Sequence, residues 1–334
     1  MIRPSRRTRT LPALLALPLA LTTLSACAGA PEPEPRKVAD DGFPVEVTSC
    51  DFTSTVTAPP ESAVTMNQGA TEVMLALDLA DHMAGTAYLD DAVPERWQAA
   101  YDEVAVLSKE YPDNETLLAA EPDFVYSSYL SAFDADAAGP RDELADLGIA
   151  TYNSPFGCGE GHERAEIAFD SVWGEIETVA TAFGVPERAQ AIEEGQQAAL
   201  DELADSRPGE GHTAFWFDSG DKTAFAGAGQ GGPQLILDAV GATNVFADLE
   251  GSWADVSWER VVKADPDVIV LADASWSTAD DKIALLEKDP ALKELRAVRA
   301  GAYVVVPFSE STPGVRLADG AVSVGAQLAE LNLG

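Results

Sequence analysis

The chain has 334 residues, of which 46% are hydrophobic and 23% charged, as is typical of a folded globular protein. Its 56 acidic residues outnumber 21 basic ones and give a formal net charge of −35, which excludes nucleic acid as a partner because phosphates would be repelled. The three histidines, His82, His162 and His212, are scattered, so we expect no site for a bare metal ion and no cofactor.

The N-terminus predicts a secretion signal. Four arginines precede an apolar run, residues 11–24, that is shorter than a membrane-spanning helix. The run ends at Ser25-Ala26-Cys27, which resembles the bacterial lipobox and implies that Cys27 is lipidated after residues 1–26 are removed. The alternative is an ordinary signal peptide that happens to end near a cysteine. Residues 27–44, rich in Pro, Ala and Glu, predict a flexible tether, so we expect an extracytoplasmic protein anchored to the outer face of the cell membrane.

Residues 45–185 alternate between short apolar runs and helical patterns, which predicts an α/β lobe with a parallel sheet. The predicted strands are 63–66, 83–87, 124–126 and 150–152, and the predicted helices are 71–79, 115–120 and 140–147. Cys50 and Cys158 both fall in this lobe, and in an oxidising compartment two such cysteines are expected to form a disulfide.

The segment 187–204 is polar, rich in alanine and free of proline, and it predicts one long helix within 186–206. The alternation resumes in residues 207–334. Here the predicted strands are 213–217, 268–271 and 303–306, and the predicted helices are 233–240, 258–264 and 282–287. More than one core is expected for a chain of this length, so the sequence predicts two lobes joined by one helix.

An internal repeat supports this division. The stretch from Glu115 to Asp123 matches the stretch from Glu259 to Asp267, and in each an Ala-x-Pro-Asp sequence leads into an apolar run. Each copy predicts a short helix that ends at proline, followed by a parallel strand. The simplest account is two similar α/β lobes.

The order and spacing of several motifs resemble the helix-linked class of periplasmic substrate-binding proteins, which serve ABC importers of siderophores, haem and corrinoids. The motifs are Thr65-Met-Asn-Gln-Gly-Ala-Thr-Glu72, the two repeats, Gly229-Gln-Gly-Gly-Pro233, Asn244-Val-Phe-Ala-Asp248, Leu295-Arg-Ala-Val-Arg299 and Pro313-Gly-Val-Arg316. The resemblance implies two Rossmann-like lobes with parallel sheets, a ligand cleft between them, little closure, and no catalysis.

Ligand contacts are expected beyond the carboxyl ends of the strands, where loops and helix N-termini converge. Polar and aromatic side chains in these places predict a site for a large, flat or chelated ligand. In the N-terminal lobe they are Asn67, Gln68, Thr71, Tyr88, Tyr126, Tyr129 and Phe156, and in the C-terminal lobe Trp216, Gln230, Trp276, Phe308 and Arg316. Thr71 also fits plain helix capping, and strand aromatics are often core residues. The family resemblance places Arg316 where many members carry a cleft arginine for anionic ligands, and a surface ion pair is the alternative.

The resemblance also implies that Glu115 and Glu259 lie on the outer face of each lobe and dock to arginines of the transporter's permease. The competing interpretation is that they are solvated glutamates favoured by the helix dipole. The expected partners are thus permease and ATPase subunits, a small-molecule ligand and the membrane, and the protein is expected to be a monomer.

A ferric siderophore is the first expectation for the ligand, because it is the commonest cargo of this architecture. A corrinoid, haem or a deazaflavin coenzyme precursor would each also suit an aromatic cleft. A secreted hydrolase is the alternative of another class, with Ser219 between Asp218 and Asp221 and either His162 or His212 as base. The sequence offers no Gly-x-Ser-x-Gly elbow for it.

Overall fold

The protein is described from a computed structural model that covers residues 42–331 and Leu333. The expected signal peptide, Cys27 and all but the end of the expected tether lie outside the described residues. Within the described part of the chain, no helix has both the length and the apolarity to cross a membrane.

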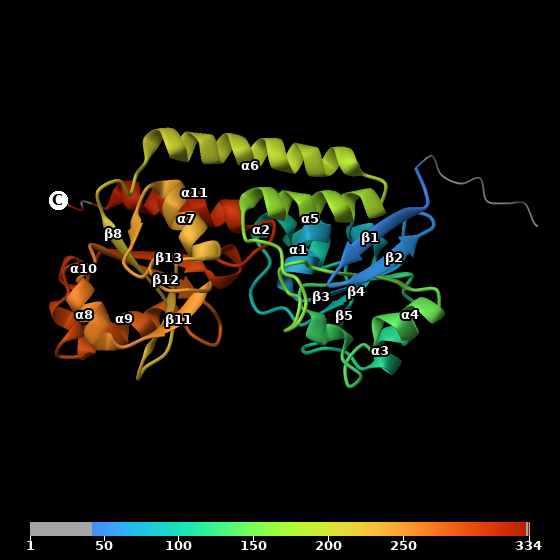
Figure 1. Ribbon diagram of the computed structural model, residues 1–334, viewed down its shortest axis with the longest axis horizontal. Coiled ribbons are helices and arrows are strands. Elements are labelled where there is room, and N and C mark those ends of the chain that lie inside the picture. The colour runs from blue at the N-terminus through green and yellow to red at the C-terminus, as the bar shows by residue number, and fades with distance from the viewer. Residues whose placement is uncertain (1–41, 332, 334) are drawn as a thin grey trace, which may run out of the picture. The chain divides into compact units, whose positions relative to one another are not determined.

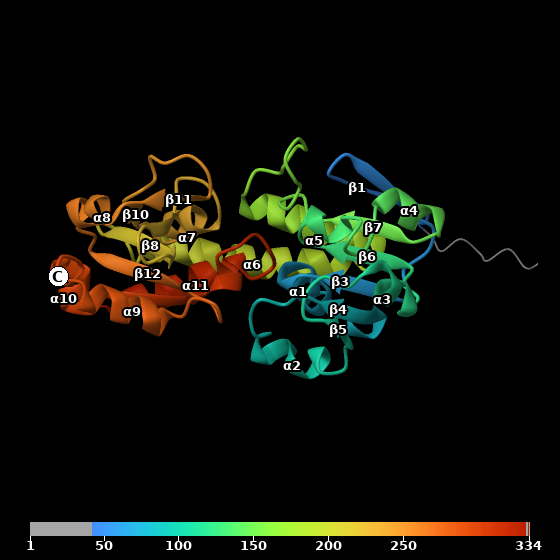
Figure 2. The same ribbon diagram turned by 90° about the horizontal axis from the view of Figure 1, so that it is seen from below.

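The N-terminal lobe, on the right in Figure 1, is built on a five-stranded sheet in the order β5-β4-β3-β6-β7, and Figure 2 labels all five strands. Its strands are β3 (Ala63–Met66), β4 (Met83–Ala87), β5 (Val106–Ser108), β6 (Phe124–Ser127) and β7 (Ala150–Asn153), and every neighbouring pair is parallel. This is the Rossmann order, in which successive strands run outward first on one side of β3 and then on the other. The carboxyl ends of all five strands therefore meet at one edge, with the change of direction between β3 and β6.

Helices cover both faces of this sheet because its strands are buried on both sides. Alternate residues of β6 show the division: Phe124 and Tyr126 join the core under α1 (Gln68–Ala76) and α5 (Phe169–Ala182), whereas Val125 joins the core under α3 (Asn114–Ala119) and α4 (Arg141–Asp146). The short α2 (Glu95–Tyr101) follows β4 and lies next to α1. Single turns of 3-10 helix lie at Ala80–His82, Leu130–Phe133, Leu292–Glu294 and Phe308–Glu310.

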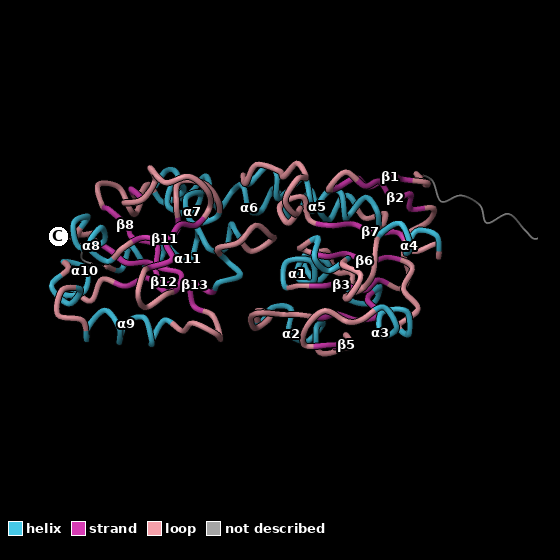
Figure 3. Tube along the Cα trace, turned by 60° about the horizontal axis from the view of Figure 1, so that its bottom comes forward, coloured by secondary structure: helices cyan, strands magenta, loops and turns pink. Residues whose placement is uncertain are grey.

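The C-terminal lobe has its own sheet, in the order β11-β9-β8-β12-β13 with β10 also paired to β8. Figure 3 labels its strands β8, β11, β12 and β13. Its strands are β8 (Thr213–Ser219), β9 (Ala224–Gly227), β10 (Thr243–Asn244), β11 (Trp253–Val256), β12 (Val268–Asp273) and β13 (Tyr303–Pro307). This sheet is mixed: β8, β10, β12 and β13 run parallel, as expected, whereas β9 runs antiparallel to both β8 and β11. Only four residues separate β8 from β9, and a connection this short joins antiparallel strands.

Two sets of helices enclose this second sheet (Figures 1 and 2). Trp216 of β8 and Val270 of β12 join the core shared with α7 (Gly232–Val240) and α11 (Leu317–Glu330). The intervening positions, such as Phe217 and Leu271, face α8 (Trp258–Ala264), α9 (Ala279–Lys288) and α10 (Arg296–Ala300). The lobe is thus a three-layer sandwich like the first.

One long helix, α6 (Pro186–Ser206), lies along both lobes. It begins with proline at its first position and ends at Arg207 in the left-handed conformation. Figure 1 shows it packed over α5 at one end and over α11 and α7 at the other. A single apolar cluster runs from the N-terminal lobe past Leu200 and Leu203 into the C-terminal lobe, so this side of the protein has one continuous core.

A β-hairpin, β1 (Val45–Ser49) and β2 (Phe52–Val56), precedes the first lobe and was not predicted. Its two-residue turn, Cys50 and Asp51, has both residues at positive φ. The buried hydroxyl of Ser54 holds the hairpin to β7 by donating to the carbonyl of Thr151, and a disulfide from Cys50 to Cys158 joins it to the segment after β7.

The repeated aspartates have the same structural role in both lobes. The carboxylate of Asp123 accepts the backbone N–H groups of Glu61 and Ser62 at 2.7 and 3.0 Å, just before β3. The carboxylate of Asp267 accepts the N–H of Thr213 at 2.9 Å, at the start of β8. In each lobe the aspartate therefore ties the start of the central strand to the next strand, which explains why the Ala-x-Pro-Asp sequence recurs.

Candidate functional site

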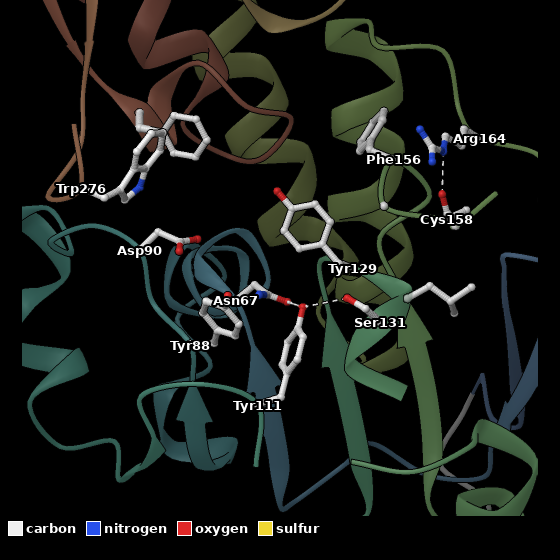
Figure 4. A pocket seen from close by; sticks show the side chains of 14 residues that line it. Asn67, Tyr88, Asp90, Tyr111, Tyr129, Ser131, Phe156, Cys158, Arg164 and Trp276 are labelled. Atoms are coloured by element: carbon white, nitrogen blue, oxygen red, sulfur yellow. Dashed lines mark hydrogen bonds between the residues drawn. The ribbon is translucent and has the colours of Figure 1, made fainter. Parts of the chain in front are cut away.

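A cavity of ≈ 630 Å³ lies at the carboxyl edge of the first sheet and is lined by both lobes (Figure 4). The N-terminal lobe contributes a residue after each strand: Asn67 after β3, Tyr88 after β4, Tyr111 after β5, Tyr129 after β6 and Phe156 after β7. The C-terminal lobe contributes Trp276 and Phe308, which follow β12 and β13. Loops that follow parallel strands converge at one edge, and this convergence builds the site.

Aromatic rings form most of the cavity wall. The rings of Tyr88 and Tyr111 meet edge to face with centroids 4.8 Å apart, and those of Trp276 and Phe308 do so at 5.5 Å. Tyr129 and Trp276 are among the most exposed large aromatic side chains, at 45% and 55%. Large apolar rings left open to solvent around a cavity indicate a surface that a ligand covers.

Two residues at the base of the site have strained backbones. Asn67, which precedes α1, has φ 74° and Tyr88 has φ 57°, both unusual for residues other than glycine. The Asn67 side-chain oxygen accepts the hydroxyls of Tyr111 at 3.2 Å and Ser127 at 3.3 Å. These bonds hold the amide so that its nitrogen remains available to a ligand. Strain of this kind is typically kept where function requires it.

The cavity contains one acidic and one basic side chain, Asp90 and Arg164. Partial burial, together with the neighbouring charge of Asp91, raises the pKa of Asp90 above its usual range. Arg164 donates through Nε to the carbonyl of Cys158 at 2.6 Å, which fixes its position on the loop after β7. The cavity as a whole is therefore close to neutral.

A second cavity of ≈ 620 Å³ adjoins the first, and Phe156 and Arg164 line both. Gln230, a predicted ligand residue, lies here on the loop before α7, and its side-chain oxygen accepts the N–H of Gly251 at 3.2 Å. Gln68, also predicted, lies in a small pocket of ≈ 30 Å³ beside Asn67 and Phe308. The predicted residues Asn67, Tyr88, Tyr129, Phe156, Trp276 and Phe308 all line the first cavity.

Two of the predicted aromatic contacts are core residues instead. Tyr126 is 1% exposed and donates its hydroxyl to Glu175 of α5 at 2.6 Å, and Trp216 is fully buried under α7 and α11. Both are interior residues of strands whose alternation turns them toward a helix-covered face. The cavity is lined by residues that follow the strands and not by these two, so these two predictions were wrong.

Thr71 is also buried and does not line the cavity. Its hydroxyl donates to the carbonyl of Asn67 at 3.0 Å and lies 2.7 Å from the hydroxyl of Thr86. It thus secures the first turn of α1 against β4, which corrects the prediction of a ligand contact.

Arg316, predicted to grip an anionic ligand, is 5% exposed and engaged with carboxylates of the protein itself. It lies 3.2 Å from Glu72 of α1 and 2.7 Å from Glu310, and it donates to Ser309. Burial raises the pKa of Glu72 to about 7, although the Arg316 charge opposes the change. The group links residues of the two lobes, so its role in this structure is a structural one.

The cavity residues missed from the sequence include four whose side chains can hydrogen-bond: Asp90, Tyr111, Ser131 and Arg164. Tyr111 and Ser131 are joined through their hydroxyls at 3.3 Å. The residues that follow predicted strands offered a usable signal, but β5 is only three residues long and was not recognised, so Tyr111 had no strand to follow. Arg164 lies eleven residues beyond the end of β7, in an irregular segment that no local pattern places.

The remaining predicted residues lie elsewhere. Glu115 and Glu259 are exposed in the first turns of α3 and α8, on the side of the protein remote from α6 (Figure 1). In the hydrolase alternative, Ser219 donates to Asp218, whereas His162 pairs with Asp51 at 2.9 Å. Among the described residues, no hydrogen bond joins Ser219 to His162 or to His212, so the hydrolase alternative has no serine–histidine pair.

The sequence comparisons agree with this architecture. Residues 64–309 match the family described as periplasmic binding protein. A vitamin B12-binding protein of Pectobacterium atrosepticum is 26% identical over 286 residues, which cover 83% of this chain and 91% of that protein. An uncharacterized ABC transporter substrate-binding lipoprotein of Bacillus subtilis is 26% identical over 318 residues, which cover 91% of this chain and 92% of that protein.

Solved structures share the fold over nearly their full length. A periplasmic binding protein from Veillonella parvula has a TM-score of 0.74 and 28% identity, covering 86% of this chain and 97% of the other. An ABC-type Fe3+-hydroxamate transport system protein from Saccharomonospora viridis has a TM-score of 0.70 and 23% identity, covering 85% and 99%. The chain therefore belongs to the periplasmic binding protein family, as the ligand-binding component of an ABC importer and not an enzyme.

Proposed function

We propose that this protein is a lipid-anchored, monomeric receptor that captures a corrinoid outside the cell and delivers it to the importer's permease. The observation that carries the proposal is the nearly neutral, aromatic cavity of ≈ 630 Å³ that both lobes line. Aromatic rings give a large, flat ligand extensive apolar contact, and a few polar groups then set its orientation.

The charges favour this ligand over an anionic chelate. Arg164 is the only basic residue among those that line the two adjoining cavities, whereas the second cavity adds Glu166 and Asp238. Arg316 is engaged with Glu72 and Glu310. A ferric siderophore rich in carboxylate or catecholate groups would thus meet repulsion in a protein of formal charge −35.

The relatives support the same ligand class. The protein from Pectobacterium atrosepticum named for vitamin B12 binding aligns along 91% of its length, so the similarity extends across both lobes. A ferric siderophore remains the second candidate ligand if it is a neutral or cationic hydroxamate, because the charges at Asp90 and Arg164 do not disfavour such a ligand. A deazaflavin precursor that carries phosphate has less support, because the predicted arginine is not available.

We assign docking to the permease, and so delivery of the ligand, to Glu115 and Glu259. Glu115 and Glu259 occupy equivalent repeat positions and are exposed, and the helices that carry them, α3 and α8, lie on the side of the protein remote from α6 (Figure 1). Their spacing along the chain places one on each lobe, as needed for a permease that contacts both. The predicted lipid on Cys27 would keep the receptor near that permease, which raises its effective concentration there.

The test is calorimetric titration of the protein without its signal sequence with cyanocobalamin, haem and a ferric hydroxamate. We expect cyanocobalamin to bind most tightly. Trp276→Ala and Tyr129→Ala should each weaken binding about 10- to 100-fold, since each removes an aromatic ring from the wall. Leu147→Ala, at an exposed apolar residue outside the cavity, is the matched control and should have no effect. Preferential binding of the hydroxamate or haem would refute the corrinoid assignment.

A further inference from the structure

Asp90 is a carboxylate that faces a cavity with aromatic walls. It follows β4 and lines both the main cavity and the small pocket next to Phe308. Figure 4 shows its oxygens directed into the cavity, near Tyr129 and below Trp276. Asp90 is half-buried and forms no salt bridge within 4.0 Å to any of the described residues. A carboxylate placed in this way lacks the partner that its partial burial requires.

The adjacent residue, Asp91, shows the contrast. The Asp91 side chain accepts the hydroxyl of Ser309 at 2.6 Å and lies 4.0 Å from Arg316, so its charge is balanced within the protein. Asp90 has no such contact, and its carboxylate lines the cavity. The two neighbouring acids therefore differ in function: one links the lobes and the other remains open to the cavity.

The single arginine lies at the opposite end of the same cavity. In Figure 4 the ring of Tyr129 separates Asp90 from Arg164, and Trp276 closes the side nearest Asp90. The rings near Asp90 also suit a cationic or N–H-bearing group, because the faces of aromatic rings attract positive charge. The cavity is thus polar at its two ends and apolar between them.

We infer that Asp90 is a specificity-determining residue, which accepts a hydrogen bond from an amide or ammonium group of the ligand while Arg164 faces an acceptor group at the other end. The inference deepens the corrinoid proposal and rests on it for the identity of the ligand. For a corrinoid the donor is one of the peripheral amides. A carboxylate in place of that amide would be repelled by Asp90, so the same residue also excludes the acidic analogue.

The test uses cyanocobalamin and its monocarboxylic acids, in each of which one peripheral amide is replaced by a carboxylate. We expect one regioisomer to bind the wild-type protein about 10- to 100-fold more weakly than cyanocobalamin, because a charge-assisted hydrogen bond is replaced by repulsion. Asp90→Asn should restore most of that loss. Asp81→Asn, the same change at an exposed acid outside the cavity, is the control and should restore none.

Equal binding of all the acids, or a loss that Asp90→Asn fails to restore, would overturn the inference while the corrinoid assignment stands. If no corrinoid binds, the assignment of the ligand fails and a second pair of probes applies to Asp90. Ferrioxamine B carries a terminal ammonium group, which its N-acetyl derivative lacks. Wild type should prefer the ammonium form by about 10-fold and Asp90→Asn should not; equal affinities for the two would overturn the inference in that case too.

Discussion

Replacing Arg316 by methionine is expected to destabilise the fold, because this arginine is the counter-charge of a buried acidic group. Glu72 is 2% exposed and lies 3.2 Å from the guanidinium, and Glu310 lies at 2.7 Å. The substitution keeps most of the side-chain volume but leaves Glu72 buried without a positive partner. It therefore tests the electrostatic role separately from packing.

The expected loss of stability follows from the burial of the Arg316–Glu72 pair. Breaking a buried ion pair by removing one partner typically costs about 3–5 kcal/mol of unfolding free energy. With a urea m-value of about 3 kcal/mol/M, as expected if both lobes unfold together, the midpoint of urea unfolding should fall by about 1–2 M. Part of the cost will be recovered by protonation of Glu72, whose pKa is already raised to about 7, so the loss should be smaller at pH 5 than at pH 8.

Urea denaturation followed by tryptophan fluorescence measures this change. Glu72→Gln in the Arg316→Met background should recover stability, because the uncompensated charge is then absent. Arg260→Met is the matched control: its ion pair with Asp248 is exposed, so it should cost less than about 1 kcal/mol. An Arg316→Met protein as stable as wild type, or one that folds normally but no longer binds ligand, would refute this account of Arg316.

Three further predictions concern other parts of the protein. Burial raises the pKa of Glu175 from 4.5 to about 7, so the folded state binds the proton more tightly than the unfolded state does. The free energy of unfolding should therefore decline as pH rises from 4.5 to 7. Urea titrations at several pH values should show that Glu175→Gln removes up to about 3 kcal/mol of this decline. Glu115→Ala with Glu259→Ala should leave ligand affinity unchanged and reduce uptake by cells, whereas lost affinity would show that these glutamates are misassigned. Replacing both Cys50 and Cys158 by serine should lower the free energy of unfolding by about 2–5 kcal/mol, because the disulfide joins residues 108 apart in sequence. It should also weaken ligand binding, because Cys158 lines the cavity. An unchanged melting temperature and ligand affinity would contradict this prediction.

The sequence was sufficient for the elements whose patterns are local. Strand β3 (Ala63–Met66), strand β4 and helix α8 were predicted at the observed bounds, because each is a compact apolar run or a helical stripe between clear turn signals. The repeat located α3 and α8 at equivalent points of the two lobes. Helix α6 followed from a long segment without proline.

Other elements were missed for physical reasons. The hairpin β1–β2 is polar on its exposed face and depends on contacts with β7 and on the disulfide, which lie about a hundred residues away in sequence. Strands β9 and β11 are short, and they pair with each other although α7 and β10 lie between them in the chain. Such long-range contacts leave no local periodicity.

The site was predicted best where residues directly follow strands. Asn67, Tyr88 and Phe308 follow β3, β4 and β13 and do line the cavity. Tyr126 and Trp216 lie inside strands, where only the direction of the pleat decides between core and cleft, and the sequence alone does not fix that direction. Arg316 was misassigned because its partners, Glu72 and Glu310, come together only in the folded protein.

Native mass spectrometry of the protein purified from its own host, without its signal sequence, tests the central claim most directly. A co-purifying small molecule would remain bound in the cavity between the lobes under gentle ionisation. We predict a cobalt-bearing adduct of corrinoid mass, which the Trp276→Ala variant retains less well than the Leu147→Ala control. An iron-bearing adduct in its place would contradict the corrinoid assignment and return the ligand to the siderophore or haem class.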